Sequence, residues 1–155
     1  MKKSLFDQFR SIAYEHAGIS LAAGKEALVA ARVAKRVRAL GLGSAEEYLD
    51  QLVADETGEE LVRFLDAMST NFTSFFRERV HFEILGEQLR KWISEGQQRF
   101  RIWSAASSTG EEPYSIAITL LEAAAGRALD VKVLATDIST RVLAEATRGL
   151  YAASR

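Results

Sequence analysis

The sequence predicts a mixed α/β fold in which an N-terminal all-α helical bundle precedes a β-α-β-α segment. Apolar residues recur at helical spacing over residues 1–70, with no strand-like run among them. Two runs of strand-forming residues, 99–105 and 131–136, then flank one amphipathic helical pattern. That alternation implies parallel strands joined by a right-handed crossover.

Four amphipathic helices are expected over residues 1–70. The first ends at Gly18, and the second runs from about 25 to 40 and stops at a Gly-Leu-Gly break. Ser44 followed by Glu47 has the spacing of a capping box for the third helix, and the acidic turn 54–60 precedes the fourth. The stripes that predict this bundle are Leu5, Phe9, Ile12, Ala13; Val29, Val33, Val37, Leu40; Tyr48, Leu49, Leu52; and Leu61, Phe64, Leu65, Met68.

The second half alternates helix and strand. A helix is expected from about 80 to 94 and a strand over 99–105, and Pro113 suits the first turn of the next helix. A strand over 131–136 and a short helix over 140–148 follow. The two helical faces that we expect to be buried are Phe82, Leu85, Leu89, Trp92 and Ile116, Ala117, Leu120, Leu121, Ala124. We therefore expect an all-α domain over 1–70, a connecting segment and helix over 71–98, and a partial α/β domain over 99–155.

Composition excludes several classes of protein. The 155 residues are 48% hydrophobic and 26% charged, which is typical of a soluble globular protein. No apolar run approaches the length of a membrane span, and a cytoplasmic protein is the default expectation. Cysteine is absent and the two histidines, His16 and His81, are far apart, so we expect no disulfide, no cysteine nucleophile and no metal.

Charge is distributed unevenly along the chain. Residues 1–43 hold eight Lys or Arg against three acids, a balance of +5, whereas residues 44–66 hold one Arg against eight acids, a balance of −7. Lys25, Arg32 and Arg36 lie beside the apolar stripe of the second helix, which predicts a basic face for an acidic partner. A local balance of only +5 and a net charge of −1 argue against nucleic acid as that partner.

A row of hydroxyls, one glycine and two glutamates, residues 107–112, follows the first expected strand, and Asp137 follows the second. In a βαβ unit ligands bind beyond the carboxyl ends of the strands, where Asp137 can accept hydrogen bonds from a ribose diol. The glycine fingerprint for a pyrophosphate is missing, and two carboxylates repel phosphate, so a cationic nucleoside such as S-adenosylmethionine suits the site better. The alternative, of equal weight on spacing alone, is that these acids only complement a helix dipole.

The stretch TNFTSFFRE (70–78) lies between the bundle and the next helix. We expect its three aromatic residues, Phe72, Phe75 and Phe76, to be core residues. For Arg77 and Arg79, one interpretation is that they are simply two solvent-exposed charged residues without a specific role.

Several of these segments together resemble the chemotaxis receptor glutamate methyltransferases, the CheR family. The motifs that carry the resemblance are, in chain order, AGISLAAGKEALVAARVAKRVRALGL, SAEEYL, TNFTSFFRE followed by HF, IWSAASSTGEEPYSIA, LATDIS and VLAEATRGLY. The resemblance implies an N-terminal helical domain and the first β-α-β-α part of a Rossmann-like methyltransferase sheet. It also implies transfer of a methyl group from S-adenosylmethionine to glutamate side chains on the cytoplasmic helices of methyl-accepting chemotaxis receptors, leaving S-adenosylhomocysteine.

The resemblance also implies roles for individual residues. Asn71, Thr73 and Arg77 would reach the cofactor, with Arg77 also near the sulfur and the incoming glutamate as the catalytic residue. Glu112 would contact the cofactor and Asp137 would hold its ribose. The residues that would dock on the acidic receptor helices are Lys25, Arg32, Lys35, Arg36 and Arg38.

Two departures from the family pattern are apparent. Ser107 stands where many relatives have Cys or Ala, a change between small residues from which we expect little effect. The chain stops soon after RGLY, before the remaining strands of the family's sheet. We therefore expect a truncated enzyme, a fragment, or half of an exchanged homo-oligomer that completes the sheet. A non-catalytic module that binds receptor helices through its basic helical domain is the alternative function.

Overall fold

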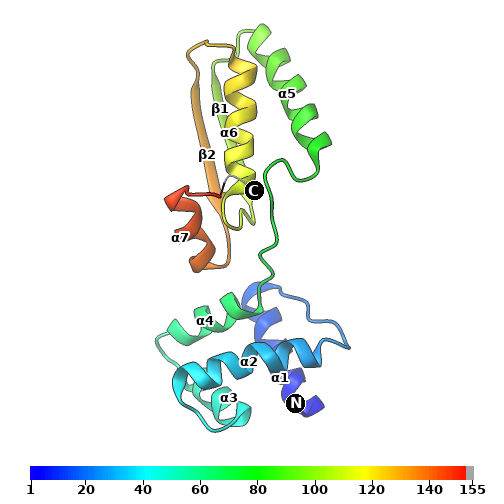
Figure 1. Ribbon diagram of the computed structural model, residues 1–155, viewed down its shortest axis with the longest axis vertical. Coiled ribbons are helices and arrows are strands. Elements are labelled where there is room, and N and C mark those ends of the chain that lie inside the picture. The colour runs from blue at the N-terminus through cyan, green and yellow to red at the C-terminus, as the bar shows by residue number, and fades with distance from the viewer. Residues whose placement is uncertain (153–155) are drawn as a thin grey trace. The chain divides into compact units, whose positions relative to one another are not determined.

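The computed structural model describes residues 1–152 and divides into two units, Met1–Thr70 and a second that begins at Asn71 (Figure 1). The first unit contains only helices, and the second combines helices with a parallel two-stranded sheet, which confirms the predicted fold class. The elements are α1 (Lys3–Ala17), α2 (Glu26–Leu40), α3 (Ala45–Ala54), α4 (Glu59–Met68), α5 (Arg79–Ser94), β1 (Arg99–Ala105), α6 (Glu111–Ala124), β2 (Asp130–Thr136) and α7 (Thr140–Arg148).

Three aromatic side chains form the centre of the first unit. The ring of Phe9 on α1 stacks on Tyr48 of α3 at a centroid distance of 5.9 Å and contacts Phe64 of α4 at 5.7 Å. All three residues are fully buried, and Val29 and Val33 of α2 join the same cluster. Burial of such side chains contributes about 1.5–3 kcal/mol each, so the predicted apolar stripes explain why the four helices pack together.

The ends of the helices follow the local signals in the sequence. Ser44 Oγ accepts a hydrogen bond from the Glu47 amide at 3.1 Å, as a capping box requires. In a capping box the Glu47 carboxylate would accept a hydrogen bond from the amide of Ser44 itself. Here it accepts from the amide of the preceding residue, Gly43, at 2.8 Å. Gly18 and Gly41 end α1 and α2 in the left-handed conformation, with φ of 65° and 69°.

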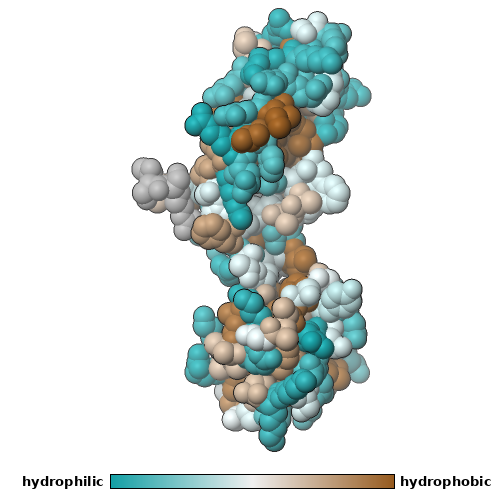
Figure 2. All heavy atoms as spheres, turned by 90° about the vertical axis from the view of Figure 1, so that its right-hand side faces the viewer, coloured by the Kyte–Doolittle hydropathy of each residue, from teal (hydrophilic) through white to brown (hydrophobic). Residues whose placement is uncertain are grey.

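In the second unit, β1 and β2 pair in parallel, with Arg99 opposite Asp130 and Ala105 opposite Thr136. Helices α5 and α6 lie side by side (Figure 1), and both pack on the sheet. Their shared core is Leu89, Ile93, Phe100, Ile116, Leu120 and Ala123. Figure 2 faces the side on which α5 lies in Figure 1 and shows a small hydrophobic patch within a mostly hydrophilic surface of this unit. Within residues 1–152, no helix has both the length and the apolar character that crossing a membrane requires.

The buried stripe of α6 differs from the predicted one. Leu121 is 74% exposed, whereas Ser115 and Thr119 are buried in its place. Each of these hydroxyls donates to a carbonyl one turn back, Ser115 Oγ to Glu111 O at 2.7 Å and Thr119 Oγ1 to Ser115 O at 2.9 Å. Because their hydrogen bonds are satisfied within the helix, these polar residues can face the core.

Three other apolar residues are more exposed than predicted. Phe72 is 75% exposed, so the prediction that it is a core residue is wrong; Phe76 is 37% exposed. Trp92 on α5 is also 37% exposed and contacts Phe100 at a ring distance of 6.4 Å. For Phe72 and Phe76 the reason is local, because a segment without helical or strand periodicity carries no signal for the direction in which a side chain points.

Candidate functional site

The site is built on the loop that joins β1 to α6. The Ser107 amide donates to Thr136 O at 2.9 Å and so extends the sheet ladder, and the Gly110 amide donates to Ser107 O at 3.0 Å and closes a turn. Along this loop the backbone adopts positive φ at Ala106 (63°), Ser108 (48°) and Gly110 (100°). Such values cost about 1–3 kcal/mol for residues other than glycine and cluster at functional sites.

Two carboxylates accept hydrogen bonds at the end of β1 and in this loop. Glu112 Oε1 accepts a hydrogen bond from Ser104 Oγ at 2.7 Å, at the end of β1. Asp137 Oδ2 accepts from the Ser108 amide at 2.8 Å, and its Oδ1 accepts from the Ser139 amide at 2.9 Å. An ionised carboxylate offers about four acceptor positions, so both groups retain capacity for further donors, such as ribose hydroxyls or an ammonium group.

The two adjacent glutamates of the loop have different environments. Glu111 is 1% exposed, and its Oε2 accepts from Thr109 Oγ1 at 2.6 Å. Glu112 is exposed at the start of α6. The exposed carboxylate is therefore the better placed of the two to meet a ligand.

Two buried hydroxyls of the loop make no hydrogen bond within the described residues. Ser107 is fully buried and Ser108 is 6% exposed, yet neither Oγ has a partner. An unsatisfied buried polar group costs about 1–3 kcal/mol. Unpaired hydroxyls beside two carboxylates fit S-adenosylmethionine, which is polar and cationic. This cofactor has no phosphate, so it does not need a glycine-rich loop whose backbone amides bind a pyrophosphate.

Two tyrosine hydroxyls connect the loop and α6 to the C-terminal residues, Tyr151 through the loop and Tyr114 of α6 through α7. Tyr151 OH donates to Thr109 O at 2.7 Å, and Tyr114 OH donates to Ala146 O at 3.2 Å. A Cβ at Gly110 would lie 2.5 Å from the Tyr151 hydroxyl oxygen and 2.9 Å from Ala146 Cβ. Only glycine fits there. Burial raises the pKa of Tyr151, and the nearby Glu111 carboxylate acts in the same direction.

The segment 71–78 supplies the remaining predicted cofactor residues. Asn71 and Thr73 are half-buried, whereas Arg77 is exposed. The Arg77 guanidinium donates to Phe72 O at 2.9 Å and lies 5.5 Å from the centre of the Phe72 ring. Glu112 and Asp137 are thus bonded to residues 104 and 108, at the end of β1 and in the loop that follows, while Arg77 contacts its own segment. Arg79 pairs with Glu83 at 3.0 Å on the exposed surface of α5.

The five basic residues predicted to dock on a receptor fall into two groups. Arg36 binds Glu60 of α4 bidentately at 2.8 and 2.7 Å, and Tyr48 OH donates to the same carboxylate at 2.8 Å. Arg32 donates to Met68 O, at the end of α4, at 2.5 Å. The remaining members of the predicted set are exposed: Lys25, Lys35 and Arg38.

Comparison with known proteins decides the family. A model of the CheR methyltransferase SAM binding domain matches residues 71–155, and a model of the CheR methyltransferase all-alpha domain matches residues 4–69. The chain belongs to the CheR methyltransferase family. This agrees with the predicted resemblance and with a site that suits S-adenosylmethionine.

Curated relatives of the CheR family are similar along nearly the whole chain. Chemotaxis protein methyltransferase 2 of Pseudomonas aeruginosa is 48% identical over 150 residues, which cover 97% of this chain and 52% of the relative. The chemotaxis protein methyltransferases of Salmonella typhimurium and Escherichia coli are 46% and 41% identical, each over 94% of this chain and 49% and 50% of the relative. The chain therefore spans about half the length of these CheR relatives.

Three residues with hydrogen bonds around the candidate site were not singled out from the sequence: Ser104, Ser115 and Tyr151. Phe76 and Thr109, the partners of Ser115 and Tyr151, are 39 and 42 residues away, so no spacing rule marks them. Ser104 is only eight residues from Glu112, but it lies within a strand and its side-chain partner is not marked by any spacing rule. Within residues 1–152, no cluster of three or more His, Cys, Asp or Glu is arranged to hold a metal ion.

Proposed function

We propose that this chain forms the receptor-docking and cofactor-binding part of a cytoplasmic, S-adenosylmethionine-dependent protein-glutamate O-methyltransferase that acts on chemoreceptor helices. The observation that carries the proposal is the joint attachment of Glu112 and Asp137 to residues 104–108, beside the unpaired Ser107 and Ser108 hydroxyls. The match of residues 71–155 to the SAM binding domain and the names of the curated relatives support it.

Each residue has a defined task in this proposal. S-adenosylmethionine supplies, when bound, a methyl group activated by positively charged sulfur. Asp137 accepts hydrogen bonds from the ribose hydroxyls, and Glu112, Asn71 and Thr73 hold the rest of the cofactor. Arg77 binds the incoming glutamate carboxylate, a partner for which the planar guanidinium is suited.

The residues of the site need only to align the reactants. A glutamate side chain is ionised at pH 7, so the chain has no need for a general base to generate the nucleophile. Holding two reactants in line contributes a large part of the acceleration in such reactions. A site rich in orienting groups and without a nucleophile-base pair is therefore consistent with methyl transfer.

Calorimetry with S-adenosylhomocysteine tests the cofactor site. We expect the wild type to bind and Asp137→Asn, which keeps the side-chain shape but removes the charge, to bind at least about tenfold more weakly. Asp130→Asn is the matched control, because Asp130 lies at the opposite end of β2 and pairs with Arg99 and Arg101 on the surface. Absence of binding by the folded wild type would contradict the proposed function.

The docking surface includes Lys25, Arg32, Lys35, Arg36 and Arg38, of which the exposed Lys25, Lys35 and Arg38 are free to meet an acidic helix. Lys35→Glu with Arg38→Glu should weaken binding of a synthetic methylation-helix peptide, and added salt should do the same. Arg90→Glu with Lys91→Glu makes the same change of charge on α5 and is the control. Peptide binding by a chain that does not bind S-adenosylhomocysteine would favour the non-catalytic docking module.

A further inference from the structure

The segment 71–78 holds an unusual backbone without helix or strand to support it. Phe76 and Glu78 have φ of 51° and 55°, in the left-handed region that non-glycine residues rarely adopt. Such residues persist only where the surroundings fix them. Arg77, the proposed catalytic residue, lies between these two positions. The contact that fixes the backbone of Phe76 therefore also fixes the backbone position from which the Arg77 side chain extends.

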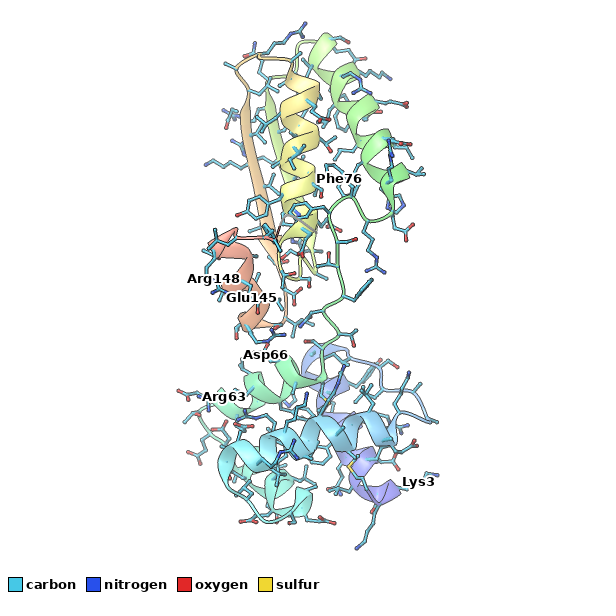
Figure 3. The ribbon with its side chains drawn as sticks, viewed as in Figure 1. Lys3, Arg63, Asp66, Phe76, Glu145 and Arg148 are labelled. Atoms are coloured by element: carbon cyan, nitrogen blue, oxygen red, sulfur yellow. The ribbon has the colours of Figure 1, made fainter. Side chains whose placement is uncertain are left out.

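The hydroxyl of Ser115 provides that support. Ser115 is fully buried in the second turn of α6, and its Oγ accepts a hydrogen bond from the Phe76 amide at 3.0 Å. The same Oγ donates to Glu111 O at 2.7 Å, which fixes the direction of its proton. The labelled Phe76 lies beside α6 in Figure 3. This long-range bond joins the segment that carries Arg77 to the helix that carries Glu112.

Within the segment the Arg77 amide donates to Ser74 O at 3.3 Å, a local turn, and further contacts with residues outside it are between aromatic rings. The Phe75 ring meets Tyr151 edge-on at 4.9 Å, and the Phe76 ring meets Phe82 at 5.3 Å. These rings hold the segment near Tyr151 and α5, yet an aromatic contact does not set a backbone dihedral. The Phe76–Ser115 bond, in contrast, ties the backbone of the segment to another element, one residue before Arg77.

We propose that Ser115 is a positioning residue, whose hydroxyl fixes the 71–78 segment so that Arg77 and Glu112 are presented to one cofactor. The inference rests on the proposed function, because that proposal assigns both residues to the cofactor. Ser115 itself has no contact with the cofactor in this proposal; it acts through Phe76.

Thr119 offers a matched control on the same helix. It is 6% exposed, lies one turn further along α6, and donates to the carbonyl one turn back as Ser115 does. Thr119→Val keeps the branched shape and removes the hydroxyl. The two variants, Ser115→Ala and Thr119→Val, therefore each remove one buried hydroxyl, but only the first removes the bond to Phe76.

The first measurement is amide hydrogen exchange at Phe76 by NMR, with urea unfolding to verify that each variant is folded. Ser115→Ala should raise the Phe76 exchange rate about tenfold, and Thr119→Val should leave it within about twofold of the wild type. Ser115→Cys, with a weaker acceptor of similar size, should lie between them and replaces Ser115→Ala if that variant does not fold. Unchanged exchange in Ser115→Ala, or equal acceleration in Thr119→Val, would overturn the proposal.

The second measurement is S-adenosylhomocysteine affinity in a double-mutant cycle. Ser115→Ala should weaken binding about five- to tenfold, and it should add little to the loss caused by Arg77→Ala, because Ser115 acts through the same segment. Additive losses would overturn the positioning role. If the wild type does not bind, the proposed function fails, and the exchange rate at Phe76 alone then decides whether Ser115 anchors the segment.

Discussion

At the scale of single residues, Gly110 shows how the backbone limits which residues the loop between β1 and α6 can contain. Its φ is 100°, and a Cβ there would lie 2.5 Å from the Tyr151 hydroxyl oxygen. Gly110→Ala should therefore cost about 1–3 kcal/mol of unfolding free energy, from strain and from displacement of the tyrosine, and should also weaken S-adenosylhomocysteine binding. Urea unfolding and calorimetry measure the two effects.

The variant Gly126→Ala separates backbone strain from displacement of the tyrosine. Gly126 also has a positive φ, 82°, but a Cβ there would meet nothing within 4 Å. The Gly126 variant should show the strain alone and keep its affinity for S-adenosylhomocysteine. Equal losses of stability and affinity in both variants would show that the close approach at Gly110 contributes nothing.

Tyr48 gives the first unit a pH dependence at high pH. Burial raises the pKa of Tyr48 far above its usual value, and its hydrogen bond to the Glu60 carboxylate acts in the same direction. The unfolded state therefore loses the proton first, so stability is intact below about pH 10 and falls above it, by up to about 1.4 kcal/mol per pH unit. Urea unfolding between pH 7 and 11 should show this slope.

In Tyr48→Phe, the unfolding free energy should no longer fall above about pH 10 because of this tyrosine. The variant should also be less stable at pH 7, because the Glu60 carboxylate loses a hydrogen-bond donor. Tyr14→Phe is the control, since Tyr14 is 64% exposed. A slope that is the same in Tyr48→Phe and in the wild type would show that another group titrates.

Some residues of the site could be identified from the sequence and others could not. Asp137 and the pair Glu111 and Glu112 follow the ends of predicted strands, so the local pattern was enough to propose them. The choice of Glu112 over Glu111 came from the family resemblance. Ser104 and Ser115 act through partners that are brought close only by folding. The sequence also placed Arg36 on a docking face, because periodicity shows which face carries a charge but not that Glu60 lies opposite it.

At the scale of elements, α2 holds both ends of α4. Arg36 pairs with Glu60 in the first turn of α4 at 2.7 Å, with side-chain exposures of 19% and 8%, and Arg32 binds a carbonyl at its last turn. Removing one partner of such a buried pair leaves an uncompensated charge. Arg36→Ala should therefore lower the unfolding free energy by about 3–5 kcal/mol in urea unfolding.

Lys35→Ala is the matched control, because Lys35 is the exposed neighbour on the same helix. It should change stability by less than about 0.5 kcal/mol. Similar small losses in both variants would contradict the clamping role of Arg36. The same contrast makes Lys35, and not Arg36, the informative position for receptor-binding experiments.

Element boundaries were predicted better than element faces. Strand 99–105 and helix 140–148 agree with β1 and α7 because strand-forming residues, a Ser cap and a terminal Gly mark their limits. The face of α6 was wrong at Leu121, since the sequence does not reveal that Ser115 and Thr119 satisfy their hydroxyls within the helix. Hydrophobicity alone assigns such hydroxyl residues to the surface.

At the scale of the whole molecule, the two units have separate apolar cores. The cluster around Phe9, Tyr48 and Phe64 contains only residues of the first unit, and the cluster around Leu89 and Phe100 contains only residues of the second. Even a small unit can fold alone when it has its own core. We therefore expect the peptide 1–70 to be helical by circular dichroism and to unfold cooperatively in urea.

The matching peptide 71–155 should be the less stable of the two. Its parallel sheet has two strands, and Trp103 and Leu134 on these strands are 67% and 60% exposed. Parallel sheets are stable when both faces are covered, so this apolar surface contributes little to the stability of the unit. A lower urea midpoint for 71–155 than for 1–70 is the expected result. A disordered 1–70 peptide, under conditions where the full chain is folded, would show that the bundle depends on the residues that follow it.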